Sequence, residues 1–350
     1  MNHPMEKLVR PGILALAPYR SARDEFGSTA DVFLDANENS LGDPWGDGLH
    51  RYPDSGQGAL KSAVARRKGV LPEQIFLGNG SDEAIDLLLR AFCEPGLDNV
   101  IIMPPTYGMY AVQAGIHGAE LRQAPLRPDF SPDPPAVRAV TDARSKLLFL
   151  CSPNNPTGQC LPEDFILDML GDFPGLVVID EAYVDFARQP TWLDRLNDFP
   201  NLVVLQTLSK AWGLAALRVG MAFSGAFVNG ILNKIKYPYN LGAPAIDIAL
   251  KALENESVVQ DKINILLAER RRLALRLPEL TCVREVFPSD ANFLLVRVAD
   301  AEGIYRYLLE QSIVVRNRHR ERHCENCLRI TVGTAEENDR LLAALKHYPA

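Results

Sequence analysis

The sequence predicts an α/β protein with a large, mostly parallel sheet covered by helices on both faces. Short apolar runs of strand length recur through the middle of the chain, and helical or loop stretches separate them. Such crossovers join parallel strands, which are usually buried on both faces. A hydrophobic content of 47% over 350 residues can fill a substantial core. The runs lie at 74–78, 99–103, 146–151, 176–180, 201–208 and 218–223.

The chain beyond Pro244 predicts a smaller α/β layer. A long helical pattern at 245–277 is followed by a strand-like run at 291–298, a helix near 301–311, a strand at 327–333 and a closing helix. Up to about Asn39 the sequence is punctuated by prolines and suits an extended arm. We therefore predict an N-terminal arm with a small-domain contribution at 1–48, a large domain at 49–245 and a small C-terminal domain at 246–350.

Charge and composition exclude several classes of protein. The net charge of −7 and the pI of about 5.5 argue against a nucleic-acid partner, because phosphate backbones are held by clustered Lys and Arg. The amino terminus lacks the features of a secretory signal, and no apolar run is long enough to span a bilayer. Six cysteines without a framework spacing suit a reducing compartment. We expect a cytoplasmic protein with no membrane partner.

A glycine-containing turn at 78–85 could bind phosphate. Here a predicted strand ends in two glycines, and Ser81 and Asp82 open a helical pattern. The free N–H groups of a helix start favour an anion. Alternatively, this is a plain strand-to-helix turn in which Ser81 or Asp82 is the N-cap residue.

Polar residues follow two further predicted strands. Tyr107 could lay its ring against a flat ligand, although, taken alone, the sequence favours a place in the core for it. Asn155 lies in a turn held rigid by prolines and can donate a side-chain hydrogen bond, unless the turn has no role beyond its shape.

The strands at 176–180 and 201–208 end in charged groups. Asp180 closes the most apolar strand, so its carboxylate needs a cation or a protonated ring nitrogen nearby, and a structural ion pair is the alternative. Lys210 follows the next strand. A partly desolvated amine is nucleophilic and can bind an aldehyde carbon, although a lysine at a strand end is often simply solvated.

Together these residues supply a group for every part of pyridoxal 5'-phosphate. Lys210 would bind the aldehyde carbon, and Asp180 would keep the ring nitrogen protonated. Asn155 and Tyr183 would bond the ring hydroxyl, and Tyr107 would cover the ring. The phosphate would be held by Ser81, Asp82, Ser209 and Arg218. The sequence contains neither GxGxxG nor GxxxxGK[ST], so a nicotinamide site or a Walker-type nucleotide site would account for fewer of these residues than pyridoxal phosphate does.

The motifs GNGSDEA, PPTYGMY, SPNNPTG, IDEAY and SKAWGLAALRVG, in this order, resemble the class I and II aminotransferases of fold type I. Four further segments resemble the histidinol-phosphate aminotransferases within that group. They are APYRSAR at 17–23, LDANEN at 34–39, RYPD at 51–54 and CLRITVGTAEEN at 327–338.

This resemblance implies a homodimer with shared active sites that transfers an amino group between L-histidinol phosphate and 2-oxoglutarate in histidine biosynthesis. Lys210 would be the cofactor lysine and proton shuttle, and Tyr52 would reach the cofactor phosphate of the neighbouring subunit. Arginine forks would hold the anionic end of the substrate. The implied substrate-binding residues are Tyr19, Asn37, Arg316 and Arg329.

Some positions depart from the family pattern, and alternatives follow. The lysine segment carries Trp212 and Ala216 where Phe and Gly are usual, and Arg20 and Asp24 replace the frequent residues beside Tyr19. An aromatic or broad-specificity aminotransferase, a phospho-amino-acid decarboxylase of the same fold and a non-catalytic cofactor- or nucleotide-binding protein therefore stay open.

A metal site is the last alternative. His319, His323, Cys324 and Cys327 could supply zinc ligands, but their spacing is shorter than zinc signatures generally have. We predict a basic surface loop there and no metal.

Overall fold

The computed structural model describes residues 3–19, 23, 30–46 and 48–349. The chain divides into two compact units: unit 1 comprises Met1–Glu94 and Leu193–Glu256, and unit 2 comprises Pro95–Trp192 and Ser257–Ala350. These units divide the chain at other points than the predicted domains do, so the domain boundaries stay a prediction. The departures at Arg20 and Asp24 lie outside the described residues.

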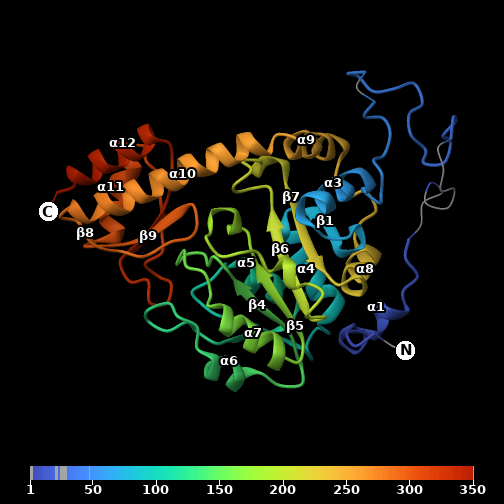
Figure 1. Ribbon diagram of the computed structural model, residues 1–350, viewed down its shortest axis with the longest axis horizontal. Helices are drawn as coiled ribbons and strands as arrows, with labels where there is room; N and C mark the ends of the chain where they lie inside the picture. Colours follow the sequence, from blue (N-terminus) through green and yellow to red (C-terminus); the bar gives the residue numbers. More distant parts are fainter. Residues whose placement is uncertain (1–2, 20–22, 24–29, 47, 350) are drawn as a thin grey trace. The chain divides into compact units, whose positions relative to one another are not determined.

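Unit 1 contains three strands of the large sheet in the order β1-β7-β6. Strand β7 is antiparallel to both neighbours, with Gly78 opposite Gly220 and Thr207 opposite the same glycine. The connection from β6 to β7 is too short for a crossover helix, so the chain reverses direction there. Helix α4 packs on β1 and β7 (Figure 1). The elements are β1 (Ile75–Asn79), β6 (Leu202–Thr207), β7 (Val219–Ser224), α1 (Pro11–Ala15), α3 (Gly58–Lys68), α4 (Ser81–Phe92), α8 (Ala226–Ile235) and α9 (Ala243–Leu253).

Unit 2 contains the other four strands of the large sheet, β5-β4-β2-β3, and all of its neighbouring pairs are parallel, as predicted. Strand β3 was not predicted, because its sequence ELRQ is polar and it pairs only with β2 at the edge of the sheet. The elements are β2 (Asn99–Ile102), β3 (Glu120–Gln123), β4 (Ser145–Cys151), β5 (Leu176–Asp180), α5 (Met109–His117), α6 (Pro134–Val140) and α7 (Glu163–Asp172).

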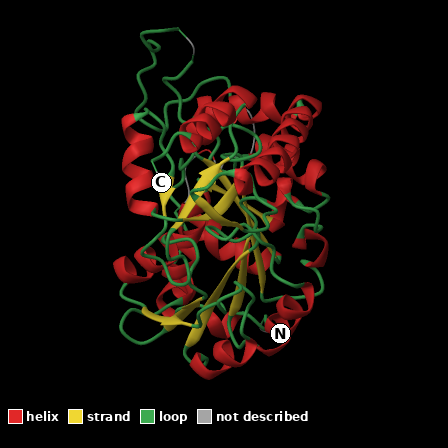
Figure 2. Ribbon diagram, turned by 90° about the vertical axis from the view of Figure 1, so that its left-hand side faces the viewer, coloured by secondary structure: helices red, strands yellow, loops and turns green. Residues whose placement is uncertain are grey.

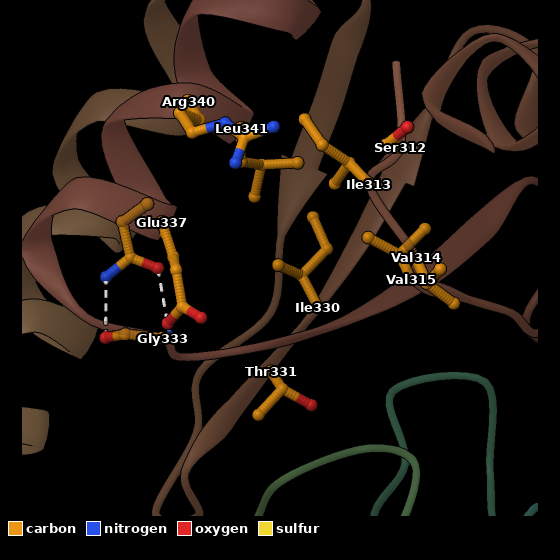
Figure 3. A pocket seen from close by; sticks show the side chains of 11 residues that line it. Ser312, Ile313, Val314, Val315, Ile330, Thr331, Gly333, Glu337, Arg340 and Leu341 are labelled. Carbon is orange, nitrogen blue, oxygen red and sulfur yellow. Dashed lines mark hydrogen bonds between the residues drawn. The ribbon is translucent and has the colours of Figure 1, made fainter. Parts of the chain in front are cut away.

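A second sheet in unit 2 has four antiparallel strands in the order β10-β11-β9-β8. Figure 2 colours the strands yellow, the helices red and the loops green. The sequence predicted β9 and β11 but not the short strands β8 and β10. The elements are α10 (Glu256–Arg276), β8 (Val283–Val286), β9 (Phe293–Val298), α11 (Ala301–Glu310), β10 (Arg316–Asn317), β11 (Cys327–Thr331) and α12 (Ala335–Lys346).

The two faces of this small sheet differ in chemistry. One face belongs to a hydrophobic core with residues of α10, α11 and α12, and its strand residues are Leu294, Val296, Val298, Leu328 and Ile330. The alternate residues form the other face. This arginine face carries Phe293, Leu295, Arg297, Cys327 and Arg329 from β9 and β11.

The long helical pattern at 245–277 is two helices, α9 and α10, rather than one. They are separated at Glu254 and Asn255. The Asn255 side chain donates a hydrogen bond to the carbonyl of Lys251 at 2.7 Å, and asparagine is a residue that competes with helical hydrogen bonding in this way. Hydrophobic periodicity alone does not reveal such a break.

Candidate active site

The turn between β1 and α4 has the geometry of an anion site. Gly80, with φ of 74°, is the N-cap residue of α4, and no side chain caps the helix. The alternative in which Ser81 or Asp82 is the N-cap is therefore wrong, since both residues already lie in the first turn of the helix. The Glu83 carboxylate accepts the N–H of Asn79 at 2.5 Å and fixes the end of the strand. The first N–H groups of α4 are of the kind that binds anions.

Arg218 lies beside this helix start. Its Nη2 is 3.3 Å from Oδ2 of Asp82, and its carbonyl accepts the N–H of Gly80 at 2.7 Å. Its φ of 57° lies in the left-handed region, which residues with a side chain seldom adopt. The structure thus brings together Ser81, Asp82 and Arg218, three of the four residues predicted to bind phosphate.

Two glycines leave room for this arrangement. A Cβ on Gly80 would collide with the Arg218 guanidinium, and a Cβ on Gly220 would collide with the backbone of Gly80 and Ser81. The helix start and the guanidinium therefore form a close-fitting cradle, and its donors are those that suit a phosphate.

Ser209 and Lys210 follow the end of β6. The Thr207 hydroxyl donates to Oγ of Ser209 at 2.9 Å and accepts the Ser209 N–H at 3.1 Å. The carbonyl of Lys210 accepts the N–H of Gly213 at 3.0 Å, so a tight turn presents the lysine, whose side chain is exposed. The N–H of Leu208 donates to the carbonyl of Val219 at 3.0 Å. This bond holds the residues after β6 next to the start of β7, which follows Arg218 of the cradle.

In unit 2, Asp180 ends β5 and is 97% buried, with a relative exposure of 3%. Its carboxylate accepts the hydroxyl of Tyr110 at 2.6 Å and the N–H of Ala182 at 3.1 Å. Sequence reasoning missed Tyr110, which is completely buried; its only signal was a second tyrosine three residues after Tyr107. Burial and the Asp180 charge raise the pKa of Tyr110 well above its usual value, so this hydroxyl stays a donor.

Asn155 and Arg329 are in direct contact. Nη1 of Arg329 donates to Oδ1 of Asn155 at 2.5 Å, which leaves the Asn155 amide nitrogen as the group that can donate elsewhere. The Arg329 guanidinium also lies over the Phe293 ring, 5.3 Å from its centroid. Burial and the charge of Arg318 lower the pKa of Arg329.

The aromatic residues of unit 2 surround these polar groups. Tyr183 is buried and meets Phe293 edge to face at 5.2 Å, and burial raises its pKa. Tyr107 is half-buried and meets Tyr110 edge to face at 5.4 Å, so it is neither a core residue nor fully exposed.

The remaining predicted residues are more exposed. Tyr52 is 50% exposed and stacks on Tyr239 with a centroid distance of 4.5 Å. Tyr19 and Asn37 are exposed in unit 1. Arg316 is exposed in unit 2 and lies opposite Arg329 in the β10–β11 pair.

The cysteine and histidine loop is compact. Nδ1 of His319 accepts the N–H of Asn326 at 2.9 Å, and Cys324 and Cys327 are buried. Across the part of the chain that the structure describes, no three His, Cys, Asp or Glu residues are grouped as metal ligands. None of the helices in that part is long and apolar enough to cross a membrane.

Comparison with known proteins identifies the class. A family model described as aminotransferase class I and II matches residues 32–345. The chain belongs to this family, whose members depend on pyridoxal phosphate.

The relatives narrow this class. A histidinol-phosphate aminotransferase of Parabacteroides distasonis is 52% identical over 343 residues, which cover 98% of each protein. Another, of Bacteroides fragilis, is 50% identical over 98% of this chain and 99% of its own length. The solved histidinol-phosphate aminotransferase of Sinorhizobium meliloti in complex with pyridoxal-5'-phosphate superposes with a TM-score of 0.79 at 25% identity over 96% of both chains. Within its family, the chain thus groups with the histidinol-phosphate aminotransferases, and the predicted fold class is confirmed.

Proposed function

We propose that this protein is a transaminase that converts L-histidinol phosphate and 2-oxoglutarate into imidazole acetol phosphate and L-glutamate, in histidine biosynthesis. The observation that carries this assignment is the identity of about half of all positions to histidinol-phosphate aminotransferases over nearly the whole chain. The reaction needs pyridoxal 5'-phosphate, which when bound serves as an electron sink for the bonds around the amino-bearing carbon.

The chain offers a suitable place for the cofactor phosphate. The cradle of Gly80, Ser81 and Arg218 supplies helix N–H groups, a hydroxyl and a guanidinium, and Ser209 adds a second hydroxyl. The carboxylate of Asp82 does not bind the anion itself. The carboxylate orients Arg218, and Asp82 contributes its backbone N–H to phosphate binding.

Unit 2 offers groups for the ring. The buried carboxylate of Asp180 favours a protonated ring nitrogen, because a buried anion needs a cationic or hydrogen-bonding partner. The Asn155 amide nitrogen and the Tyr183 hydroxyl are donors for the ring oxygen, since the pKa of Tyr183 is raised and the phenol stays protonated. Tyr107 supplies an aromatic face.

Lys210 has two tasks in this proposal. It would hold the cofactor between turnovers, and as a free amine it would take and carry the proton of the amino-bearing carbon of the substrate. The turn closed by the Lys210–Gly213 hydrogen bond positions the amine for both tasks.

Substrate anions are bound by arginine. Arg329 and Arg316, which lie opposite each other on neighbouring strands, hold the phosphate of histidinol phosphate or a carboxylate of glutamate. Tyr19 and Asn37, which lie in unit 1, are the other two proposed substrate-binding residues.

We further propose a homodimer in the cytoplasm. Large apolar side chains are exposed along the arm and in the loop after α8, and a second copy of the chain would cover them. They include Leu34, Leu41, Trp45, Tyr52 and Tyr237, which are 50–97% exposed. In the dimer, Tyr52 reaches the cofactor phosphate of the neighbouring subunit.

The test is the visible absorbance of the purified protein during titration with L-histidinol phosphate. The band of the lysine-bound cofactor should give way to that of its amine form. A band that responds only to glutamate or phenylalanine would indicate an aromatic or broad-specificity aminotransferase. Release of carbon dioxide from a phospho-amino acid, without an oxo acceptor, would indicate a decarboxylase, and a band that no amine changes would indicate a non-catalytic binding protein.

A further inference from the structure

Arg318 shares the arginine face with the two proposed substrate-binding arginines. Arg316 and Arg329 are opposite each other in the β10–β11 pair, and directly paired residues project to the same face. The N–H of Arg318 bonds the carbonyl of Cys327 at 2.9 Å, so the pairing continues one step beyond β10. Arg316 and Arg318 are two positions apart, with Asn317 between them, which puts both arginines on one face.

Glu321 holds Arg318 in place. Nη1 of Arg318 is 2.5 Å from Oε1 of Glu321, and a tight turn between the two residues is closed by a hydrogen bond of 2.9 Å. The Arg318 side chain is only 18% exposed, compared with the exposed Arg316. The pair therefore fixes a largely buried guanidinium beside the proposed substrate site.

Arg318 is close enough to act electrostatically on that site. Burial lowers the pKa of Arg329, and the charge of Arg318 lowers it further, ahead of the charge of Arg316. Burial raises the pKa of Tyr183, and the charge of Arg318 opposes this rise. Because the Arg318 charge acts on the pKa of both Arg329 and Tyr183, the three side chains lie near one another.

Unused donors remain in this group. Among the described residues, none accepts a hydrogen bond from the buried Nε of Arg318 or from the buried Nε of Arg329. Buried donors in proteins are normally paired, and an anion that carries several oxygens can pair with more than one guanidinium. With Arg316 and Glu321, the group has three positive charges and one negative charge.

We propose that Arg318, positioned by Glu321, is a third substrate-binding arginine that makes this site prefer a phosphate over a carboxylate. The net charge of the group is +2, which matches a phosphate monoester of roughly −1.5 to −2 better than a carboxylate of −1. Arg316 and Arg329 suffice for a carboxylate, and Arg318 adds the contacts that only the phosphate oxygens use. This inference rests on the proposed function.

The test compares two substrates in the holoenzyme of Arg318→Gln. The KM for L-histidinol phosphate should rise by about tenfold or more, the size expected for a lost charged hydrogen bond, while the KM for glutamate and both kcat values change by less than about twofold. Arg318→Lys should recover part of the loss. Arg320→Gln, an exposed arginine of the same loop, is the matched control and should leave both KM values unchanged.

Arg318→Gln leaves Glu321 without its partner, so a second variant guards against misfolding. Arg318→Gln/Glu321→Gln removes both charges and should show the same selective rise in KM. An unchanged KM for histidinol phosphate in both variants would overturn the proposal, as would an equal rise for both substrates. If the wild-type protein does not use histidinol phosphate, the proposed function fails. Calorimetry of inorganic phosphate binding to the holoenzyme then still tests whether Arg318 binds phosphate. Removal of the Arg318 charge should weaken that binding about tenfold.

Discussion

Arg329 donates a hydrogen bond to the Asn155 side-chain oxygen at 2.5 Å, and this contact decides which end of the asparagine amide is free. The oxygen is turned toward the arginine, so the nitrogen is available to the proposed cofactor oxygen. A residue of the small sheet and a residue after β4 thereby share one polar contact within unit 2. If Arg329 binds substrate and Asn155 binds the cofactor ring as proposed, we expect this pair to couple the two binding events.

We predict that Asn155→Asp keeps the contact with Arg329 but weakens cofactor binding. A carboxylate accepts from Arg329 at either oxygen, yet it has no N–H to donate to the ring oxygen. The dissociation constant of pyridoxal 5'-phosphate, measured by absorbance titration of the apoprotein, should rise by about tenfold. An unchanged constant would show that the Asn155 amide nitrogen does not bind the cofactor.

Replacement of Lys210 should separate cofactor binding from turnover. In Lys210→Ala the proposed phosphate cradle at α4 is unchanged, so the cofactor should co-purify, while kcat should fall by at least about a hundredfold because the proton has no carrier. Steady-state kinetics and the absorbance of the purified variant measure the two effects. Lys251→Ala, on the exposed side of α9, is the control and should behave as wild type. Normal turnover by the Lys210 variant would refute its assignment.

Tyr110 is expected to affect the reaction through Asp180. Tyr110→Phe keeps the buried ring, which stacks on Phe149, but removes the hydroxyl that bonds the carboxylate at 2.6 Å. The charged form of Asp180 then loses a donor, and kcat should fall by about tenfold with little change in the melting temperature. Since the raised pKa keeps Tyr110 protonated, the pH profile of kcat in the wild type should show no step from its ionisation. A variant with unchanged kcat would leave Tyr110 a purely structural role.

The arm should lose stability in acid because of Glu38. Burial tends to raise the pKa of this carboxyl, but hydrogen bonds from Arg51, Arg23 and the Tyr52 N–H outweigh burial and lower the pKa from 4.5 to about 2. A lowered folded-state pKa stabilises the protein above about pH 4.5, and the contribution is lost as the pH falls toward 2. The free energy of unfolding, measured with denaturant across this range, should fall less steeply in Glu38→Gln than in the wild type. Parallel curves would contradict the assignment.

Shared active sites can be tested with mixed dimers. Lys210→Ala and Tyr52→Ala should each have low activity alone. After the two variants are mixed and allowed to exchange subunits, half of the dimers would contain both chains, and one site in each of these would be intact, so about a quarter of wild-type activity should return. Recovery that is absent despite proven exchange would show that Tyr52 serves its own subunit.

The sequence predicts most of the fold because strands and helices differ in hydrophobic period. The six apolar runs are strands, whereas β3 escaped prediction because an edge strand can be polar. The direction of β7 depends on a short connection and not on its composition. In the candidate site, motif order indicates Lys210, Asp180 and Arg218. The sequence could not indicate Tyr110 or Arg318, because their significance comes from contacts with residues that are distant in the chain or on a neighbouring strand.

Successive residues of β9 and β11 alternate between the core face and the arginine face, so mutations in these strands fall into two kinds. Even-numbered residues, such as Leu328 and Ile330, belong to the core, and odd-numbered ones, such as Arg329, lie on the arginine face. Arg297 and Arg329 are only partly buried, so we expect substitutions there to change which anion is accepted with a smaller loss of stability than substitutions at the even positions. Phe293, Leu295 and Cys327 are as buried as the core residues, so the chemistry of this face can vary at its arginines without endangering the fold, but not at the residues between them.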